Sequence, residues 1–244
     1  MAQKQDDMAQ KQEDMTVVIP LRFQASVKGA TVEILSCDQN TYVGVGFFVR
    51  PDLIITAAHN LSEVYAVGAT VFVNVHADNG NLKMIEFTYR GDLVGSDISV
   101  ISSSSYTSPH VLQISSVAMV PDSCTRLAVT TFHNAISQQL GGSIPRGFGV
   151  FPAILLRRSE HHLLYDSTLF SGDSGAALIH AGDGTVIGLH QEAVNEAGDT
   201  LKEEEFKDTA KVGHSVNSLL GGLSQGFVGL RLDTAEVRDF LAKF

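Results

Sequence analysis

The chain has 244 residues, of which 44% are hydrophobic and 18% are charged, as is typical of a globular protein and not of a disordered one. Its formal net charge at pH 7 is −10, and lysine and arginine form no cluster, so partners with a dense negative charge, nucleic acid and anionic membrane surfaces, are not expected. No apolar run is long enough to predict a membrane-spanning helix.

The chain begins with a duplicated polar segment, MAQKQDD followed by MAQKQED. Residues 1–15 are predicted to form a disordered tail without a catalytic role. The segment resembles neither a secretory signal nor a transit peptide, because it lacks an apolar core and arginine. With only two cysteines, Cys37 and Cys124, this predicts an intracellular, cytoplasmic protein with free thiols. Neither cysteine lies in a glycine-rich turn or beside a basic group, so neither is expected to be a nucleophile.

From Thr16 onward, short runs of β-forming residues alternate with turn residues. They include ATVEILSC, YVGVGFFV, PDLIITAAH, TVFVNVHA, KMIEFTYRGDLV, DISVISS, TRLAVTTF, FGVFPAILLRR, HHLLYDS, GAALIHA, GTVIGLH and GFVGLRL. Many short strands with turn signals between them predict an all-β fold, a sandwich or a barrel. The polar segment 102–110 is the expected connection between two halves. The charged and then glycine-rich segment 191–225 is predicted to be a long loop.

One helix is predicted, at the end of the chain, over residues 233–244 (DTAEVRDFLAKF). Asp233 is the expected N-cap, and Glu236 three residues later completes a capping-box pattern. The apolar residues of the segment recur at helical spacing and predict a packing helix; they are Val237, Phe240, Leu241 and Phe244.

The stretch TLFSGDSGAAL, residues 168–178, contains the candidate nucleophile, Ser174. Small residues around one serine fit either a tight surface turn or a loop that turns a hydroxyl and two backbone N–H groups toward one point. A serine hydroxyl is a poor nucleophile at neutral pH, and it needs a base, a group that orients the base, and donors for an oxyanion.

His59 is the candidate base, because it ends the apolar run LIITAAH, where small neighbours leave its side chain free to enter a cleft. Asp97, in GSDISVI, precedes an apolar strand and is the candidate orienting carboxylate, since a buried carboxylate needs a donor such as a histidine N–H. Asp92 is the alternative, but its position after Gly91 is more typical of a turn residue.

The segments LIITAAHN, SDISVI and SGDSGAAL, in this order, resemble the three active-site blocks of the trypsin-like (chymotrypsin-fold) serine peptidases. YVGVGFFVRPDLIITAAH also resembles the strand pair that leads to their histidine. The resemblance covers about residues 25–244, without a counterpart for 191–225. It implies two packed six-stranded antiparallel β-barrels and a C-terminal helix: residues 16–112 with His59 and Asp97, residues 113–232 with Ser174, and residues 233–244. An α/β-hydrolase is excluded, because its histidine follows its serine.

The resemblance implies an endopeptidase that hydrolyses peptide bonds through an acyl-enzyme. Ser174 would be the nucleophile, His59 the general base and then the acid, and Asp97 the group that orients His59. The backbone N–H groups of Gly172 and Ser174 would form the oxyanion hole. The expected partner is a protein or peptide substrate, without cofactor or metal. A metal site of His161 and His162 is disfavoured, because adjacent strand residues point to opposite faces.

The sequence departs from the secreted members of that family in two ways. No activation site precedes the first strand, so no zymogen step is expected, and Asp173 needs a partner other than a newly cleaved N-terminus. The disulfide beside the histidine is missing, since Asn60 follows His59. Both departures resemble intracellular, bacterial and viral members. The alternative is a catalytically latent binding or scaffold module on the same fold.

The substrate pocket is predicted to contain Thr168 and His190. Thr168, six residues before Ser174, carries no negative charge, which disfavours substrates with arginine or lysine before the cleaved bond. His190, in TVIGLH, resembles the histidine with which glutamyl endopeptidases and some viral peptidases select Glu or Gln. The spacing to Ser174 is one residue longer than in those enzymes, and Leu169 stands where they have threonine, so a partly buried strand histidine without this role remains the equal alternative.

Overall fold

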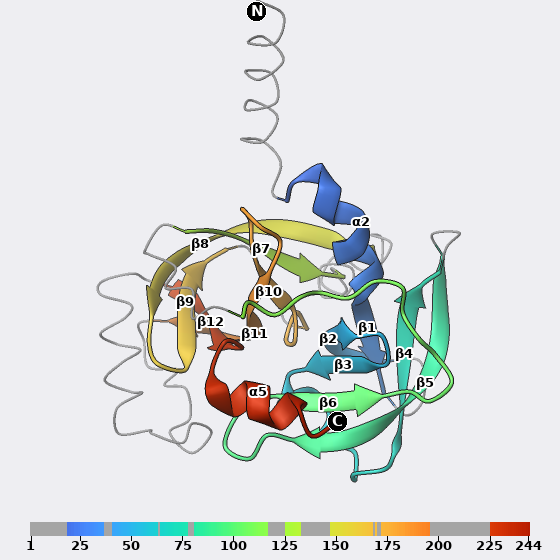
Figure 1. Cartoon of the computed structure of the whole chain (residues 1–244). Coiled ribbons are helices and arrows are strands. Elements are labelled where there is room, and N and C mark those ends of the chain that lie inside the picture. Colours follow the sequence, from blue (N-terminus) through green and yellow to red (C-terminus); the bar gives the residue numbers. More distant parts are fainter. Residues whose placement is uncertain are drawn as a thin grey trace, which may run out of the picture.

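Twelve strands form two closed antiparallel β-barrels in the computed structural model, which describes residues 19–36, 41–62, 64–77, 81–116, 125–132, 147–167, 169, 172–195 and 225–244. The first barrel has the order β1-β2-β3-β6-β5-β4 and the second the order β10-β11-β12-β9-β8-β7. Figure 1 shows the two barrels side by side. The predicted fold class, two packed six-stranded barrels with a C-terminal helix, is confirmed.

The bounds of the strands follow the apolar runs of the sequence. The first barrel consists of β1 (Thr31–Leu35), β2 (Tyr42–Arg50), β3 (Leu53–Thr56), β4 (Thr70–His76), β5 (Leu82–Asp92) and β6 (Ser99–Ser102). The second consists of β7 (Arg126–Thr131), β8 (Gly149–Arg158), β9 (His162–Asp166), β10 (Ala177–His180), β11 (Val186–Asn195) and β12 (Gln225–Arg231).

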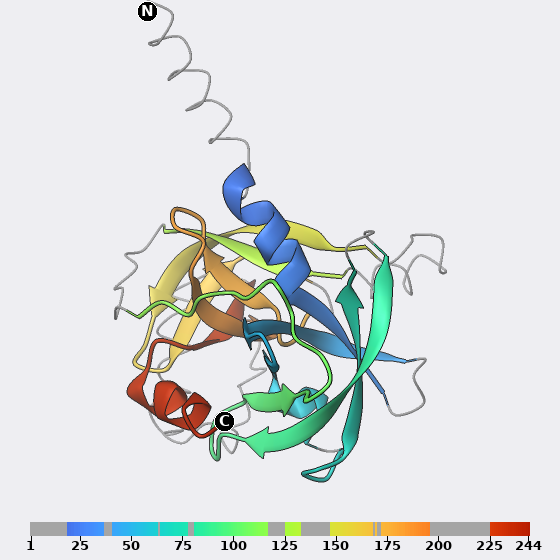
Figure 2. The same ribbon diagram turned by 45° about the vertical axis from the view of Figure 1, so that its right-hand side comes forward.

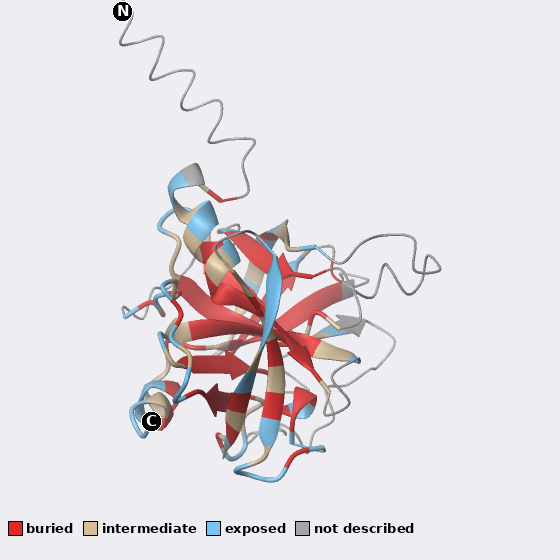
Figure 3. Ribbon diagram, turned by 90° about the vertical axis from the view of Figure 1, so that its right-hand side faces the viewer, coloured by how far each residue is buried: buried red, intermediate tan, exposed pale blue. Residues whose placement is uncertain are grey.

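Burial within the strands shows which of them lie at the centre of the molecule. Strand β4 alternates, with Val71, Val73 and Val75 buried inside the barrel, as a strand with one covered face does. Strands β1, β3 and β6 are instead buried along their whole length. Figure 3 shows the buried strands crossing the middle of the molecule and exposed residues along its outer strands. The strands that lead to His59 and Asp97 are therefore firmly held.

Helix α2 (Leu21–Ala30) lies at the junction of the two barrels and was not predicted. Figures 1 and 2 show it at the top of the views, before β1 begins. A Cβ added at Gly184 in the β10–β11 turn would lie 2.8 Å from the Phe23 ring, so the helix also packs on the second barrel. The segment has Gly29 and the β-branched Val27, both weak helix formers, and the helix owes its stability to this packing.

The C-terminal helix α5 (Ala235–Leu241) begins later and ends earlier than predicted, and its N-cap is not Asp233. The Thr234 hydroxyl accepts the backbone N–H of Val237 at 3.3 Å, so Thr234 is the cap. Asp233 pairs with Arg231 instead, with 2.7 Å between Oδ2 and Nη2. A buried ion pair next to the helix start therefore displaces the cap by one residue.

Two further expectations about local structure were wrong. Strand β3 ends at Thr56, and His59 lies in a one-turn 3-10 helix, η1 (Ala58–Asn60), and not at a strand end. Strand β11 continues to Asn195, paired with β12, so the predicted loop 191–225 begins inside a strand. The repeat 1–15, the rest of that loop, both cysteines and Thr168 lie outside the described residues. Within the described ranges, no helix has the length and apolar character needed to cross a membrane.

Candidate active site

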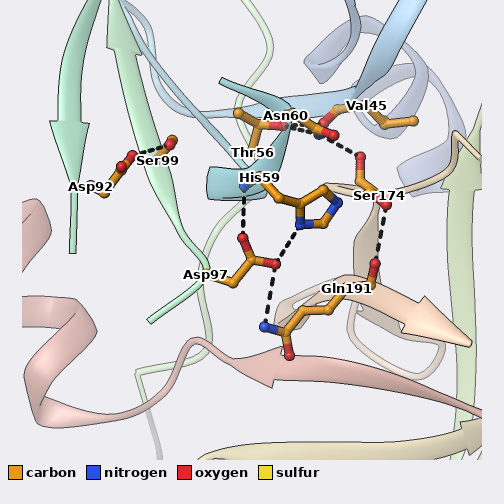
Figure 4. Close-up of polar contacts among 9 residues, drawn as sticks. All are labelled: Val45, Thr56, His59, Asn60, Asp92, Asp97, Ser99, Ser174 and Gln191. Carbon is orange, nitrogen blue, oxygen red and sulfur yellow. Dashed lines mark hydrogen bonds and ion pairs between the residues drawn. The ribbon is translucent and has the colours of Figure 1, made fainter. Parts of the chain in front are cut away.

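His59 and Asp97 face each other at the ends of two paired strands. Strand β3 pairs with β6 through Thr56 and Ser99, which places the turn after β3 beside the residues that precede β6. The backbone N–H of His59 donates to Oδ1 of Asp97 at 2.9 Å, and His59 Nδ1 lies 2.8 Å from Oδ2. Both carboxylate oxygens thus hold the same histidine (Figure 4), one through its backbone and one through its ring.

The environment of Asp97 favours its ionised form. Burial by itself would raise the pKa of the carboxyl, but the hydrogen bonds and charge of His59, with a contribution from Gln191, outweigh burial and lower it. The side chain of His59 is 47% exposed and that of Asp97 16% exposed. A largely covered negative charge therefore orients an imidazole that remains open to solvent and to a substrate.

Asp92, the alternative carboxylate, is hydrogen-bonded to a residue other than His59. It ends β5 and accepts a hydrogen bond from the Ser99 hydroxyl. Figure 4 shows this pair apart from the His59 ring. The structure therefore brings Asp97, and not Asp92, to His59.

The loop that carries Ser174 is held by residues of the first barrel. The Ser174 carbonyl accepts the backbone N–H of Val45 and the side-chain N–H of Asn60, both at 2.9 Å. A Cβ added at Gly175, where φ is +90°, would lie 2.0 Å from the Val45 carbonyl oxygen. Only glycine fits a backbone that is this closely packed and left-handed at the same time. Contacts between the barrels thus place Ser174 beside His59.

The hydroxyl of Ser174 donates to the backbone carbonyl of Gln191 at 3.1 Å. The imidazole of His59 turns toward Ser174 in Figure 4. The three residues proposed from the sequence, His59, Asp97 and Ser174, thus lie close together. The serine hydroxyl is hydrogen-bonded to the backbone carbonyl of Gln191.

Gln191 is part of this site and was missed by sequence reasoning. The register of β11 against β12 shifts between His190 and Glu192, so Gln191 is the extra residue of a β-bulge. Bulges re-aim side chains, and here the Gln191 amide reaches the first barrel, with Nε2 at 3.5 Å from Asp97 Oδ2. Gln191 is buried, and the only sequence signal for it is a polar residue that directly follows an apolar strand.

Two backbone N–H groups flank Asp173 in the turn around Ser174, and the hydrogen bonds between described residues do not use them. Among the described residues, no acceptor takes the N–H of Gly172 or of Ser174. Gly172 has a φ of +100°, and its carbonyl accepts the Tyr42 hydroxyl at 2.6 Å, which fixes the turn from the first barrel. Asp173 between them is buried and accepts the hydroxyl of Thr131.

His190 lies on β11 next to Gln191 and is almost completely buried. Its Nδ1 lies 2.6 Å from the Tyr165 hydroxyl, and burial lowers its pKa to about 3, so the ring is neutral at physiological pH. Because Thr168 is not described, the predicted pocket pair has no observed geometry.

The rings of His161 and His162 are not directed toward one common point. His162 is buried on β9, where burial lowers its pKa to about 4, and the two rings are 6.5 Å apart at a 76° angle. In the part of the chain that is described, no three histidine, cysteine or acidic side chains are grouped as metal ligands would be.

Protease domains are among the solved structures with a similar fold. The protease domain of MamO from Magnetospirillum magneticum, in its apo form, has a TM-score of 0.57 and 12% identity over 90% of this chain and 97% of that one. The inactive form of the Rv3671c protease has a TM-score of 0.57 and 20% identity over 90% of both chains. A serine-to-alanine variant of Rv3671c from M. tuberculosis, also inactive, gives 0.56 and 19% over 90% and 89%.

Sequence comparison is more specific than this likeness of fold. No curated protein sequence matches the chain. The sequence profile of the trypsin-like peptidase domain matches residues 44–189, a range that begins in β2, ends in β11 and contains His59, Asp97 and Ser174. Covering more than half of the chain, this match shows that the protein belongs to the trypsin-like peptidase domain family.

Proposed function

We propose that this protein is a serine endopeptidase in which Ser174, His59 and Asp97 form the catalytic triad. The observation that carries the proposal is the double contact of Asp97 with His59, because it fixes the ring with Nδ1 toward the carboxylate and leaves Nε2 for the substrate side. An imidazole held in this tautomer beside a serine is what general-base activation of a hydroxyl requires.

In the proposed reaction, Ser174 Oγ attacks the carbonyl carbon of the substrate while its proton moves to His59 Nε2. The oxygen that gains negative charge is held by the N–H groups of Gly172 and Ser174. The C–N bond then breaks, and the proton passes from His59 to the leaving amine. Water attacks the acyl-enzyme, gives a proton to His59 and releases the acid, and the proton returns to Ser174. Asp97 stabilises the charged imidazole in both halves.

The resting position of the nucleophile adds one step before attack. Because the Ser174 hydroxyl donates to the Gln191 carbonyl, it must rotate about its Cα–Cβ bond to donate to His59. The buried Gln191 amide near Asp97 keeps the carboxylate in place during this change.

Reaction with a fluorophosphonate probe tests the proposal, because the probe phosphonylates a serine only when a base and an oxyanion site activate it. Wild type is expected to label, and Ser174→Ala is not. Ser167→Ala is the matched control, since Ser167 directly follows β9 of the same barrel and its hydroxyl donates to the Pro152 carbonyl on β8. A folded wild type that does not label would contradict the proposal.

One observation favours a second candidate, a catalytically latent binding or scaffold module. The Ser174 hydroxyl is hydrogen-bonded to a carbonyl in the resting state, an arrangement that by itself performs no chemistry. In this case the folded protein would bind peptide segments but would neither label nor hydrolyse them. The probe experiment distinguishes the two.

We further propose a preference for a polar or acidic residue, Glu or Gln, before the cleaved bond, with His190 and Thr168 in the pocket. The neutral His190 ring, held by the Tyr165 hydroxyl, supports a hydrogen bond and not an ion pair to that residue. A peptide library varied at this position tests the preference, and cleavage after large apolar residues would contradict it. The location inside the cell stays a prediction from the sequence.

A further inference from the structure

Asp173 is a carboxylate that enters the protein interior directly beside the proposed nucleophile. It lies between Gly172 and Ser174 and is 2% exposed. Its carbonyl accepts the backbone N–H of Ala176 at 3.0 Å, so residues 173–176 form a tight turn that leads to β10. Burial of a carboxylate costs free energy unless donors surround it, so the donors around Asp173 determine where this turn lies.

The hydroxyl of Thr131 is such a donor, to Oδ1 of Asp173. Thr131 is fully buried at the end of β7, which pairs with β10 from Leu178 opposite Val129 onward. The preceding residue, Thr130, accepts the backbone N–H of Ala177 at 3.2 Å. Two consecutive threonines of one barrel strand therefore hold the turn, one at its carboxylate and one where it joins β10.

The carboxylate reaches the core of the second barrel. The pKa of the Tyr165 hydroxyl is raised by its burial and, in addition, by the negative charge of Asp173. With the side chain of Asp173 turned inward, the N–H groups on either side of it have no acceptor among the described residues. The positive φ of Gly172 lets the chain reverse at this point.

We propose that Thr131 is a positioning residue that preforms the oxyanion hole. By holding the Asp173 carboxylate inside the second barrel, its hydroxyl keeps the N–H groups of Gly172 and Ser174 on the outer side of the turn. The inference rests on the proposed function, since an oxyanion hole serves only an acyl-transfer enzyme. Because Thr131 belongs to the strand framework, the loop takes its active form without any cleavage of the chain.

Three variants of the full chain test this role. Thr131→Val keeps the shape of the side chain but removes the donor, whereas Thr131→Ser keeps the donor. Thr31→Val is the matched control, because Thr31 is equally buried and its hydroxyl donates to the Val27 carbonyl at 2.8 Å, in the first barrel. The measurements are the rate of fluorophosphonate labelling and, on a peptide substrate, kcat and KM separately.

Thr131→Val is expected to label at least tenfold more slowly and to lose kcat by a similar factor, with KM changed less than threefold. The expected loss is large because a misplaced oxyanion donor weakens binding of the transition state, and removal of one such donor lowers kcat about 10²–10³-fold. Thr131→Ser and Thr31→Val should stay within about threefold of wild type. The low-field proton signal of the His59–Asp97 hydrogen bond should persist in Thr131→Val, which separates a displaced hole from a disturbed triad.

The possible failures are distinguishable. A wild type that does not label overturns the peptidase proposal and this inference with it. A wild type that labels, with Thr131→Val labelling equally fast, overturns the inference alone. If Thr131→Val does not fold, structures of the free wild type and its peptide-boronate adduct decide instead. The same backbone at residues 172–174 in both supports a preformed hole, and a peptide flip on binding refutes it.

Discussion

Acid should destabilise this protein well before its carboxylates protonate, because it buries histidines in their neutral form. Burial lowers the pKa of His190 to about 3 and that of His162 to about 4. In the unfolded chain both would titrate near 6.5. The unfolded chain therefore binds protons more tightly than the folded protein. The contribution of the neutral histidines to the free energy of unfolding is fully present above about pH 6.5, and it is lost as the pH falls from there toward the pKa values of the folded state.

The size of this effect follows from the two pairs of pKa values. At pH 5 an unfolded histidine is almost fully protonated, whereas folded His162 holds about a tenth of a proton and His190 less. The difference amounts to about 2 kcal/mol for each residue, or about 4 kcal/mol together, relative to pH 8. His76, whose pKa burial also lowers to about 4 with the help of Lys28, acts in the same direction. Typical domains have only about 5–15 kcal/mol of stability, so the loss is easily measured.

The assay is urea unfolding at pH 8 and pH 5, followed by circular dichroism because the chain has no tryptophan. His162→Leu should remove about 2 kcal/mol of the pH dependence, since the leucine cannot titrate. Leu164→Val, a buried and non-titrating change on the same strand, should cost about 1 kcal/mol equally at both pH values. Equal wild-type stability at pH 8 and pH 5, or an unchanged pH dependence in His162→Leu, would refute the reasoning.

Three further predictions concern the site and its framework. Asp97→Asn should lower kcat about 10⁴-fold in a peptide assay, because the amide favours the wrong tautomer of His59, whereas Asp92→Asn should leave kcat within about tenfold. Gly175→Ala should lower the free energy of unfolding by roughly 3 kcal/mol or more in urea unfolding, because its Cβ would meet the Val45 carbonyl. Gly68 has a similar φ of +92° but lies in open space, so Gly68→Ala measures the backbone strain alone, about 1 kcal/mol or more. Equal losses of stability in the two variants would contradict this steric account. Thr234→Ala should lower the free energy of unfolding by about 1 kcal/mol through loss of the helix cap. An unchanged free energy of unfolding in Thr234→Ala would contradict the assignment of Thr234 as the cap.

Local patterns in the sequence predict the all-β class and the approximate positions of the strands, whereas the two-barrel architecture and the roles of the candidate residues come from the resemblance to the trypsin-like serine peptidases. Apolar alternation and turn residues predict the strands, because a strand buries every second side chain. The segments around His59, Asp97 and Ser174 are recognisable because each places a reactive side chain next to an apolar strand or within a glycine turn. The structure adds that Gly172 and Gly175 both adopt positive φ, which explains why glycine stands at these two positions of the turn.

What only the tertiary structure decided are contacts between distant segments. Local context already favours Asp97 over Asp92, but the contact of Asp97 with His59 depends on the pairing of β3 with β6, which no local pattern contains. Gln191 enters the site through a bulge whose cause lies in the register with β12. One donor to Asp173 is Thr131, 42 residues earlier in the chain, on a strand that reaches the turn only once the second barrel has closed. A sequence states which groups are present, but the closure of two barrels determines which of them meet.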